Sequence, residues 1–167
     1  MHFPSTPTLR PTPDRVRETI FNWLQQDVVG SRCLDLFAGS GALGFEALSR
    51  GAREVVFVES DPAAVAGVAN MLQLLGCDRG KAVRADAFAF LAQPAEPFDI
   101  VFLDPPFADR ALLRVCATLE TGGWLRAGAL VYLEDAASAG APDLPPGWTL
   151  LRSKRAGEVG YHLARHQ

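Results

Sequence analysis

The sequence predicts a single α/β domain with a Rossmann-like, mostly parallel sheet of seven strands and helices on both faces. Short apolar runs alternate with helical patterns over most of the chain, and repeated strand–helix units form a parallel sheet wrapped by helices. The first of these units contains a glycine-rich loop. With 167 residues, 49% of them hydrophobic and 21% charged, the chain is long enough for one domain and too short for two ordinary ones.

The N-terminal residues differ in composition from the rest of the chain. Residues 1–12 are rich in proline and are predicted to form an irregular arm, whereas residues 13–167 form the domain. Thr12 is suited to cap a helix and Pro13 to occupy its first position. Apolar residues then recur at helical spacing, which predicts a helix over residues 13–26 with one apolar face.

Strand and helix patterns alternate in the middle of the chain. The run Val55-Val56-Phe57-Val58 is continuously apolar, as is typical of a parallel strand buried on both faces. Strands are expected at residues 32–37, 54–59, 81–85, 98–103 and 129–134. Helices are expected between them, from residue 42 to about residue 50 and at residues 61–76, 87–91 and 110–120.

The alternation ends near the C-terminus. Residues 148–154 and 159–164 are two strand-like runs, and only residues 155–158 separate them. Two such runs are predicted to pair as an antiparallel hairpin at the C-terminal edge of the sheet. An appended hairpin departs from an ordinary dinucleotide-binding domain.

Composition limits the classes of protein to which the chain can belong. No apolar run approaches the roughly 20 residues that span a membrane, and the N-terminus lacks the hydrophobic block of a secretory signal. The three cysteines are scattered, without disulfide or zinc-ligand spacing, which indicates buried thiols in a reducing cytoplasm. We therefore expect a cytoplasmic protein with no membrane contact, and nothing in the sequence demands more than a monomer.

The distribution of charge bears on a nucleic-acid partner. The formal net charge of −3 argues mildly against one, because phosphate binding relies on Lys and Arg. Both ends of the chain are nevertheless locally basic. One basic group contains Arg10, Arg15 and Arg17, and the other contains Arg152, Lys154, Arg155 and Arg165. Charge alone leaves open whether these residues bind nucleic acid or form ordinary solvated faces.

The loop between the first predicted strand and helix carries a dinucleotide-type fingerprint. Its glycines are Gly39, Gly41 and Gly44, and glycine lets a backbone turn sharply and approach a ligand without a Cβ in the way. Glu59 ends the next predicted strand, where a carboxylate accepts hydrogen bonds from the ribose hydroxyls of an adenosine. The fingerprint fits NAD and S-adenosylmethionine equally, and it also fits a tight turn with no ligand.

Asp35, just before this loop, favours S-adenosylmethionine. A carboxylate there can hold the cationic amino group of the methionine moiety, whereas it would repel a pyrophosphate. The alternative is a structural role in which Asp35 binds loop amides. Asp86 is placed to meet the adenine amino group, with Ala87 and Phe88 beside the ring. It is an equally good N-cap for the following helix, and both roles can hold.

The segment Asp104-Pro105-Pro106-Phe107 carries the most chemical information. It follows the fourth predicted strand, and in open α/β sheets the ligand lies beyond the carboxyl ends of the strands where the strand order switches. Two prolines remove two N–H donors and leave carbonyl acceptors. Acceptors suit an exocyclic amine, whose lone pair is localised by hydrogen bonds from its N–H groups and whose proton Asp104 can receive.

Phe107 completes this segment as a flat face on which a flipped-out base can stack. The alternative is a rigid turn that ends the strand, with Phe107 in the core. The strand position and the upstream glycine loop favour the catalytic interpretation, in which Asp104, Pro105, Pro106 and Phe107 form the catalytic group.

Together these motifs resemble the bacterial 16S ribosomal RNA guanine-N2 methyltransferases of the RsmD type. The resemblance covers nearly the whole chain from about Leu9. It rests on four segments: Arg10-Pro11-Thr12-Pro13-Asp14-Arg15-Val16-Arg17-Glu18 with Phe21-Asn22-Trp23-Leu24, Leu34-Asp35-Leu36-Phe37-Ala38-Gly39-Ser40-Gly41-Ala42-Leu43-Gly44, Asp104-Pro105-Pro106-Phe107, and Ala156-Gly157-Glu158-Val159-Gly160-Tyr161. The first of them is the most particular to the family.

The resemblance implies a class I methyltransferase fold, with S-adenosylmethionine as methyl donor, S-adenosylhomocysteine as product and no metal. It implies transfer to N2 of one 16S rRNA guanine, guanine 966, in the small ribosomal subunit or an assembly intermediate. The cofactor-binding residues it implies are Asp35, Phe37, Ala38, Gly39, Ser40, Gly41, Gly44, Glu59, Ser60, Asp61, Asp86, Ala87 and Phe88. The RNA-binding residues it implies are Arg10, Thr12, Arg15 and Arg17.

The sequence differs from the family at its N-terminus, and three alternative functions remain open. Family members usually carry a Gly- and Arg-rich strand segment where this chain has residues 2–8, and we expect that difference to affect RNA binding. The same Asp-Pro-Pro geometry would serve an enzyme that methylates DNA adenine or a protein glutamine. The second alternative is an NAD-dependent oxidoreductase, but the sequence shows no Tyr/Lys or His group for hydride chemistry. A non-catalytic RNA-binding module would not need Asp104.

Overall fold

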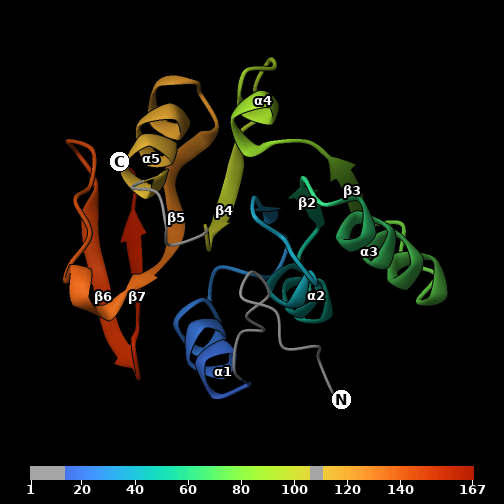
Figure 1. Cartoon of the computed structure of the whole chain (residues 1–167), viewed down its shortest axis with the longest axis horizontal. Coiled ribbons are helices and arrows are strands. Elements are labelled where there is room, and N and C mark those ends of the chain that lie inside the picture. Colours follow the sequence, from blue (N-terminus) through green and yellow to red (C-terminus); the bar gives the residue numbers. More distant parts are fainter. Residues whose placement is uncertain (1–13, 106–110) are drawn as a thin grey trace.

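A computed structural model describes residues 14–105 and 111–167, and it contains one seven-stranded sheet with the strand order β3-β2-β1-β4-β5-β7-β6 (Figure 1). The strands are β1 (Arg32–Asp35), β2 (Glu54–Glu59), β3 (Gly80–Arg84), β4 (Phe98–Leu103), β5 (Leu125–Ala136), β6 (Thr149–Ala156) and β7 (Val159–Arg165). The helices are α1 (Asp14–Trp23), α2 (Ala42–Ser49), α3 (Pro62–Leu74), α4 (Ala87–Leu91), α5 (Ala111–Thr121) and the short 3₁₀ helix η1 (Ala137–Ala139).

The direction of the strands confirms the predicted fold. Strands β1 to β5 pair in parallel, β7 pairs antiparallel with β5, and β6 pairs antiparallel with β7. The C-terminal hairpin is therefore present, with β7 inside the sheet and β6 as the outermost strand. In Figure 1, β6 and β3 lie at opposite ends of the sheet.

Helices cover both faces of the sheet (Figure 1). Helices α1, α2 and α3 pack on one face, over a core that includes Ile20, Phe57, Phe102 and Tyr132. Helices α4 and α5 pack on the other face, over the second core. Alternate residues of each strand enter the two cores, because successive side chains of a strand point to opposite faces.

The switch in strand order lies where the sequence predicts it. Strand β1 pairs on one side with β2 and on the other with β4. Strands β2 and β3 therefore extend the sheet on one side of β1, and β4 and the later strands extend it on the other. The carboxyl ends of the parallel strands β1, β2 and β4 meet at one edge of the sheet. Asp35 and Glu59 end β1 and β2, and Asp104 directly follows β4, so three acidic residues lie at the switch point, where ligands bind in this fold class.

Strands β1 and β5 differ most in length from the predictions, whereas β6 and β7 differ by one residue each. Strand β1 ends at Asp35 and not at residue 37, although the loop still follows the sheet because the Leu36 amide donates to the Phe102 carbonyl at 3.2 Å. Strand β5 begins at Leu125 and not at residue 129, because Leu125 pairs with Phe98 before the register shifts. Backbone pairing with β4 extends a segment whose own side chains carry no strand pattern.

Candidate active site

The glycine loop has the backbone conformation that only glycine adopts readily. Gly39 has φ +55° and Gly41 has φ +83°, both in the left-handed region that L side chains rarely occupy. Gly44 serves a different purpose, because a Cβ on it would lie 2.2 Å from Cε1 of Phe57. The first two glycines therefore let the loop turn sharply, and the third brings α2 close against β2.

Asp35 is buried at the end of β1, with 3% of its surface exposed. Its Oδ2 accepts a hydrogen bond from the Gly44 amide at 3.1 Å. Burial raises the pKa of this carboxyl to about 7; the Gly44 hydrogen bond lowers the pKa and the negative charge of Glu59 raises it. The structural role left open by the sequence is thus real, and a buried carboxyl with a raised pKa is also suited to a cationic partner.

Glu59 joins the end of β2 to the glycine loop. Its Oε1 accepts from the Gly39 amide at 3.0 Å and its Oε2 accepts from the Asp61 amide at 2.8 Å. A carboxylate offers about four acceptor directions, so each oxygen retains one for a further donor. The side chain is partly exposed and Ser60 beside it is exposed, which leaves this corner of the loop accessible from solvent.

Two aspartates at this edge cap helices. Asp61 Oδ2 accepts from the Ala64 amide at 3.0 Å and begins α3. Asp86 Oδ2 accepts from the Phe88 and Ala89 amides at 3.0 and 3.2 Å and begins α4. The N-cap role of Asp86 is therefore confirmed, and its position beyond β3 keeps it on the same edge of the sheet as Glu59.

The remaining cofactor residues of the prediction surround these groups. Ala38 and Gly41 are buried, Phe37 and Gly39 are half-buried and Ser40 is exposed. Ala87 is buried, and the half-buried ring of Phe88 stacks under the guanidinium of Arg114 at 4.0 Å. The side of Phe88 under that cation is thus occupied by the protein.

The structure describes only part of the predicted catalytic segment. Asp104 is half-buried and Pro105 is buried, whereas Pro106 and Phe107 lie outside the described residues. The negative charge of Asp104 contributes to raising the pKa of Tyr132 on β5, so the carboxyl group lies near that hydroxyl. Asp104 and Tyr132 therefore approach each other at the carboxyl edge of β4 and β5.

A polar wall that the sequence analysis missed stands beside Asp104. It consists of Tyr132, Glu134 and Tyr161, with Trp23 of α1 stacked on Tyr161 at a ring distance of 5.5 Å. The Tyr132 hydroxyl donates to Glu134 Oε2 at 3.2 Å. Burial, followed by the charges of Glu134 and Asp104, raises the pKa of Tyr132 well above 10, so the hydroxyl stays protonated. The signal in the sequence was Glu134, a carboxylate at the end of the predicted apolar strand 129–134, much as Asp104 stands at the end of the strand 98–103.

The predicted RNA-binding residues are placed differently from one another. Arg10 and Thr12 lie outside the described residues. Arg15 is exposed on α1. Arg17 forms ion pairs with Asp14 at 2.9 Å and with Glu46 at 3.3 Å, which ties its charge to the protein surface.

The described residues offer neither a metal site nor a membrane span. Within residues 14–105 and 111–167, no group of three or more His, Cys, Asp or Glu side chains could hold a metal ion. No helix in that part of the chain combines the length and apolar character needed to cross a membrane.

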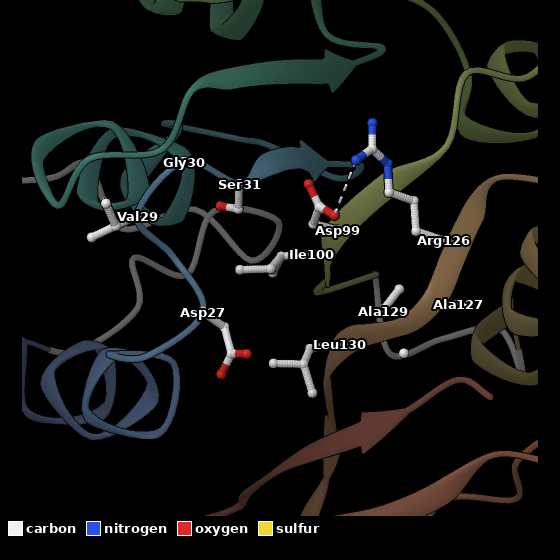
Figure 2. A pocket seen from close by; sticks show the side chains of 11 residues that line it. Asp27, Val29, Gly30, Ser31, Asp99, Ile100, Arg126, Ala127, Ala129 and Leu130 are labelled. Carbon is white, nitrogen blue, oxygen red and sulfur yellow. Dashed lines mark ion pairs between the residues drawn. The ribbon is translucent and has the colours of Figure 1, made fainter.

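A hollow lies at the edge of the sheet opposite Asp35, Glu59 and Asp104 (Figure 2). Its volume is about 280 Å³, and it is lined by the amino ends of β4 and β5 and by the residues that precede β1. Arg126 and Asp99 form an ion pair of 3.7 Å across it. Because Asp35, Glu59 and Asp104 all lie at the carboxyl edge, this hollow is separate from the candidate active site.

Comparisons with known proteins agree with the geometry. The model of a family described as "Conserved hypothetical protein 95" matches residues 1–165. The chain is 46% identical over 164 residues to "Ribosomal RNA small subunit methyltransferase D" of Escherichia coli (strain K12), across 98% of this chain and 83% of that protein.

Solved structures show the same fold. The structure described as "Putative methyltransferase yhhF from Escherichia coli" superposes with a TM-score of 0.91 at 44% identity, across 95% of this chain and 88% of that one. A "T. Thermophilus 16S rRNA N2 G1207 methyltransferase (RsmC) in complex with AdoMet and Guanosine" shares the fold at 24% identity, with a TM-score of 0.65 across 93% of this chain and 44% of that one.

Proposed function

The chain belongs to the Conserved hypothetical protein 95 family, together with ribosomal RNA small subunit methyltransferase D, and on that premise we propose its cofactor, its target and its mechanism. It is an rRNA methyltransferase. It uses S-adenosylmethionine to methylate the exocyclic N2 of a guanine in 16S rRNA, guanine 966 by family resemblance. The observation that carries the proposal is the meeting of Asp35, Glu59 and Asp104 at the switch point of the sheet.

The buried carboxyl of Asp35 supports the cofactor proposal, because a cation beside it would stabilise its charge. Asp35 is almost fully buried, and burial, followed by the charge of another carboxylate, Glu59, raises its pKa. The ammonium group of a methionine moiety would supply the missing positive charge, whereas the pyrophosphate of NAD would add negative charge. The arrangement therefore favours S-adenosylmethionine over a nicotinamide cofactor.

The other cofactor contacts follow from the loop geometry. Glu59 would accept hydrogen bonds from the ribose hydroxyls through the acceptor directions that Gly39 and Asp61 leave open. Asp86 would accept from the adenine amino group while it caps α4. When bound, S-adenosylmethionine supplies a methyl group already activated by the positive charge on sulfur.

Asp104 and Pro105 would handle the nucleophile. The guanine N2 amine donates hydrogen bonds, and Asp104 and the Pro105 carbonyl are acceptors on a backbone that proline deprives of one N–H. Two hydrogen bonds donated by the amine to these acceptors would localise its nitrogen lone pair, and Asp104 would then receive the proton that the amine releases. Because the chemistry needs little else, positioning of the amine supplies much of the acceleration.

The alternative within the same enzyme class is methylation of another planar amine, on DNA adenine or protein glutamine. Membership of the small-subunit rRNA methyltransferase family disfavours both. A relatively small chain has little surface with which to select one guanine, so we propose that it acts on the small subunit or an assembly intermediate and not on free RNA.

The test is transfer of tritiated methyl from S-adenosylmethionine to small ribosomal subunits that lack the modification. Naked 16S rRNA and duplex DNA serve as parallel substrates. We expect label in the subunits as N2-methylguanine. Label in DNA, or in a different base of the RNA, would refute the proposed target, and failure of the protein to bind S-adenosylmethionine would refute the proposed cofactor.

Asp104→Asn tests the catalytic role in the same assay. We expect turnover to fall by roughly 10²- to 10⁴-fold, the usual contribution of a positioned acid–base group, while the dissociation constant for S-adenosylmethionine stays within a few-fold. Asp78→Asn is the matched control, because Asp78 is an exposed carboxylate outside the site. Near-normal turnover in Asp104→Asn would refute the role assigned to the Asp-Pro-Pro segment.

A further inference from the structure

The outermost strand carries a row of exposed basic side chains. Strand β6 contains Arg152, Lys154 and Arg155, and every residue of the strand up to Arg155 is exposed. Only the β7 side of this strand is paired within the sheet. The other side faces away from the sheet, at the end opposite β3 (Figure 1).

These charges differ from those of several other arginines of the domain, which form ion pairs with carboxylates. Arg17, Arg32, Arg50 and Arg126 each lie within 4 Å of a carboxylate. Across the part of the chain that the structure describes, no ion pair involves a basic residue of β6. Basic residues without acidic partners, in a chain of net charge −3, mark the surface that an anionic partner would favour.

The register of the sheet places two of these cations on the face that carries the catalytic residue. Lys154 pairs with Tyr161, and Tyr161 pairs with Glu134. Directly paired residues of antiparallel strands share a face, so Lys154 lies on the Tyr161 face, which α1 covers. Arg152 lies on that face too, because it pairs with Leu163.

The distance from the catalytic residue follows from the strand order. Leu103 pairs with Leu133, so Asp104 lies level with Glu134, which in turn is level with Lys154 across β7. Strands β4 and β6 are three spacings apart in the order β4-β5-β7-β6, which corresponds to roughly 14 Å between backbones at about 4.8 Å per spacing. A strand of RNA with one base at Asp104 would extend past Lys154 within a few nucleotides.

We propose that Arg152 and Lys154 bind the phosphate groups of the RNA strand that flanks the target guanine. The proposal rests on the proposed function, because it takes the methylated base to lie at Asp104. Strand β6 then acts as an electrostatic guide that fixes the path of the RNA, while base recognition takes place at the carboxyl edge of β4 and β5. Phosphate contacts of this kind set position and affinity without reading sequence.

Exposed edge strands also carry charges to prevent pairing with another molecule, and the experiment must separate the two roles. The test variant is Arg152→Gln/Lys154→Gln. The matched control is Arg53→Gln/Lys81→Gln, which removes two exposed basic residues from the β2–β3 end of the sheet. A third variant, Arg152→Lys/Lys154→Arg, keeps both charges and exchanges the side chains.

Binding of each protein to a fluorescent 16S rRNA fragment and to unmodified small subunits is measured as a function of salt, together with methyl transfer. We expect the test variant to lose about tenfold in RNA affinity and to lower the slope of log K against log salt by about 1.4–1.8, because each lost phosphate contact lowers it by about 0.7–0.9. KM for RNA rises and kcat is unchanged. The control and the charge-preserving variant retain wild-type affinity and slope.

An unchanged slope in the test variant, with or without self-association, would overturn the proposal and leave the charges as protection of an edge strand. Loss of affinity for subunits with normal affinity for protein-free rRNA would also overturn it, because a ribosomal protein would then be the partner. If the wild-type protein binds unmodified small subunits but transfers no methyl group to them, the proposed function fails independently of this surface.

Discussion

Replacing Asp35 by Asn should stabilise the protein and weaken cofactor binding at the same time. Asn keeps the size of the side chain and an oxygen that can accept from the Gly44 amide. It removes only the negative charge, which burial makes costly. The two effects have opposite signs because the charge that destabilises the free protein is the charge proposed to hold the cofactor.

The size of the stability effect follows from the pKa of Asp35, which is raised from 3.8 to about 7. The native state therefore binds one more proton than the unfolded state between those values, so the free energy of unfolding falls as pH rises through that range. At about 1.4 kcal/mol per pH unit, ionising Asp35 costs the folded protein about 4 kcal/mol above pH 7. The Asp35→Asn variant would avoid that cost.

Urea unfolding of wild type and Asp35→Asn at about pH 4 and about pH 8 measures this difference. We expect the free energy of unfolding of the variant, relative to wild type, to increase by about 4 kcal/mol between those pH values. Contributions from other titrating groups, such as His162, whose pKa burial lowers, cancel in the comparison. A difference that does not depend on pH would refute the raised pKa.

The same pair of proteins tests the cofactor role by calorimetric titration with S-adenosylmethionine. Loss of a hydrogen bond to a charged group contributes about 1.5–3 kcal/mol, so the dissociation constant should rise roughly 10- to 100-fold in Asp35→Asn. In the wild type, affinity should fall as pH drops below about 7, because only the ionised carboxyl attracts the cofactor cation. Unchanged affinity in the variant would reduce Asp35 to a structural bond with Gly44.

Two further predictions concern packing and thiol chemistry. Gly44→Ala should destabilise the protein by about 1–3 kcal/mol, because the new Cβ would lie 2.2 Å from Phe57. The control Gly67→Ala on α3, whose Cβ would have no atom within 4 Å, should stabilise the protein by about 1 kcal/mol. Urea unfolding measures both effects, and equal effects would contradict the packing argument. Burial raises the pKa of two thiols to about 12, those of Cys33 and Cys116. Ellman's reagent at about pH 8 should therefore label only the half-buried Cys77 in the native protein, and rapid reaction of three thiols would contradict it.

Local patterns were sufficient to predict elements whose side chains decide their structure. Strands β2 and β4 and helix α4 begin and end where apolar runs and the Asp86 cap predict. The neighbouring positions of β1 and β4 were predictable as well, because strand–helix units wind in one hand and leave a switch point near the first strand. That switch point brings Asp35 and Asp104 to one edge.

Residues whose roles depend on distant segments were not predictable. Arg32 is buried at 8% exposure, where it pairs with Glu54 at 2.9 Å and lies 4.0 Å from the Phe98 ring. Nothing in the local sequence of β1 indicates that its first residue is a buried cation. The Tyr132–Glu134 bond and the Trp23–Tyr161 stack were missed for the same reason, because α1, β5 and β7 meet only in the folded sheet.

The electrostatics of the carboxyl edge explain why phosphate-binding residues would lie on β6 and not beside the catalytic residue. Asp35, Glu59, Asp104 and Glu134 lie where the proposed cofactor cation and amine would bind, and burial, followed by the charge of Glu59, raises the pKa of Asp35. The field of these carboxylates repels RNA phosphates, and it acts over roughly a Debye length, about 8 Å at physiological salt. Lys154 lies three strand spacings, roughly 14 Å, from Asp104 and two spacings, roughly 10 Å, from Glu134, so screening weakens that repulsion at β6. The cations of β6 can therefore hold the RNA backbone without neutralising the carboxylates that the chemistry requires.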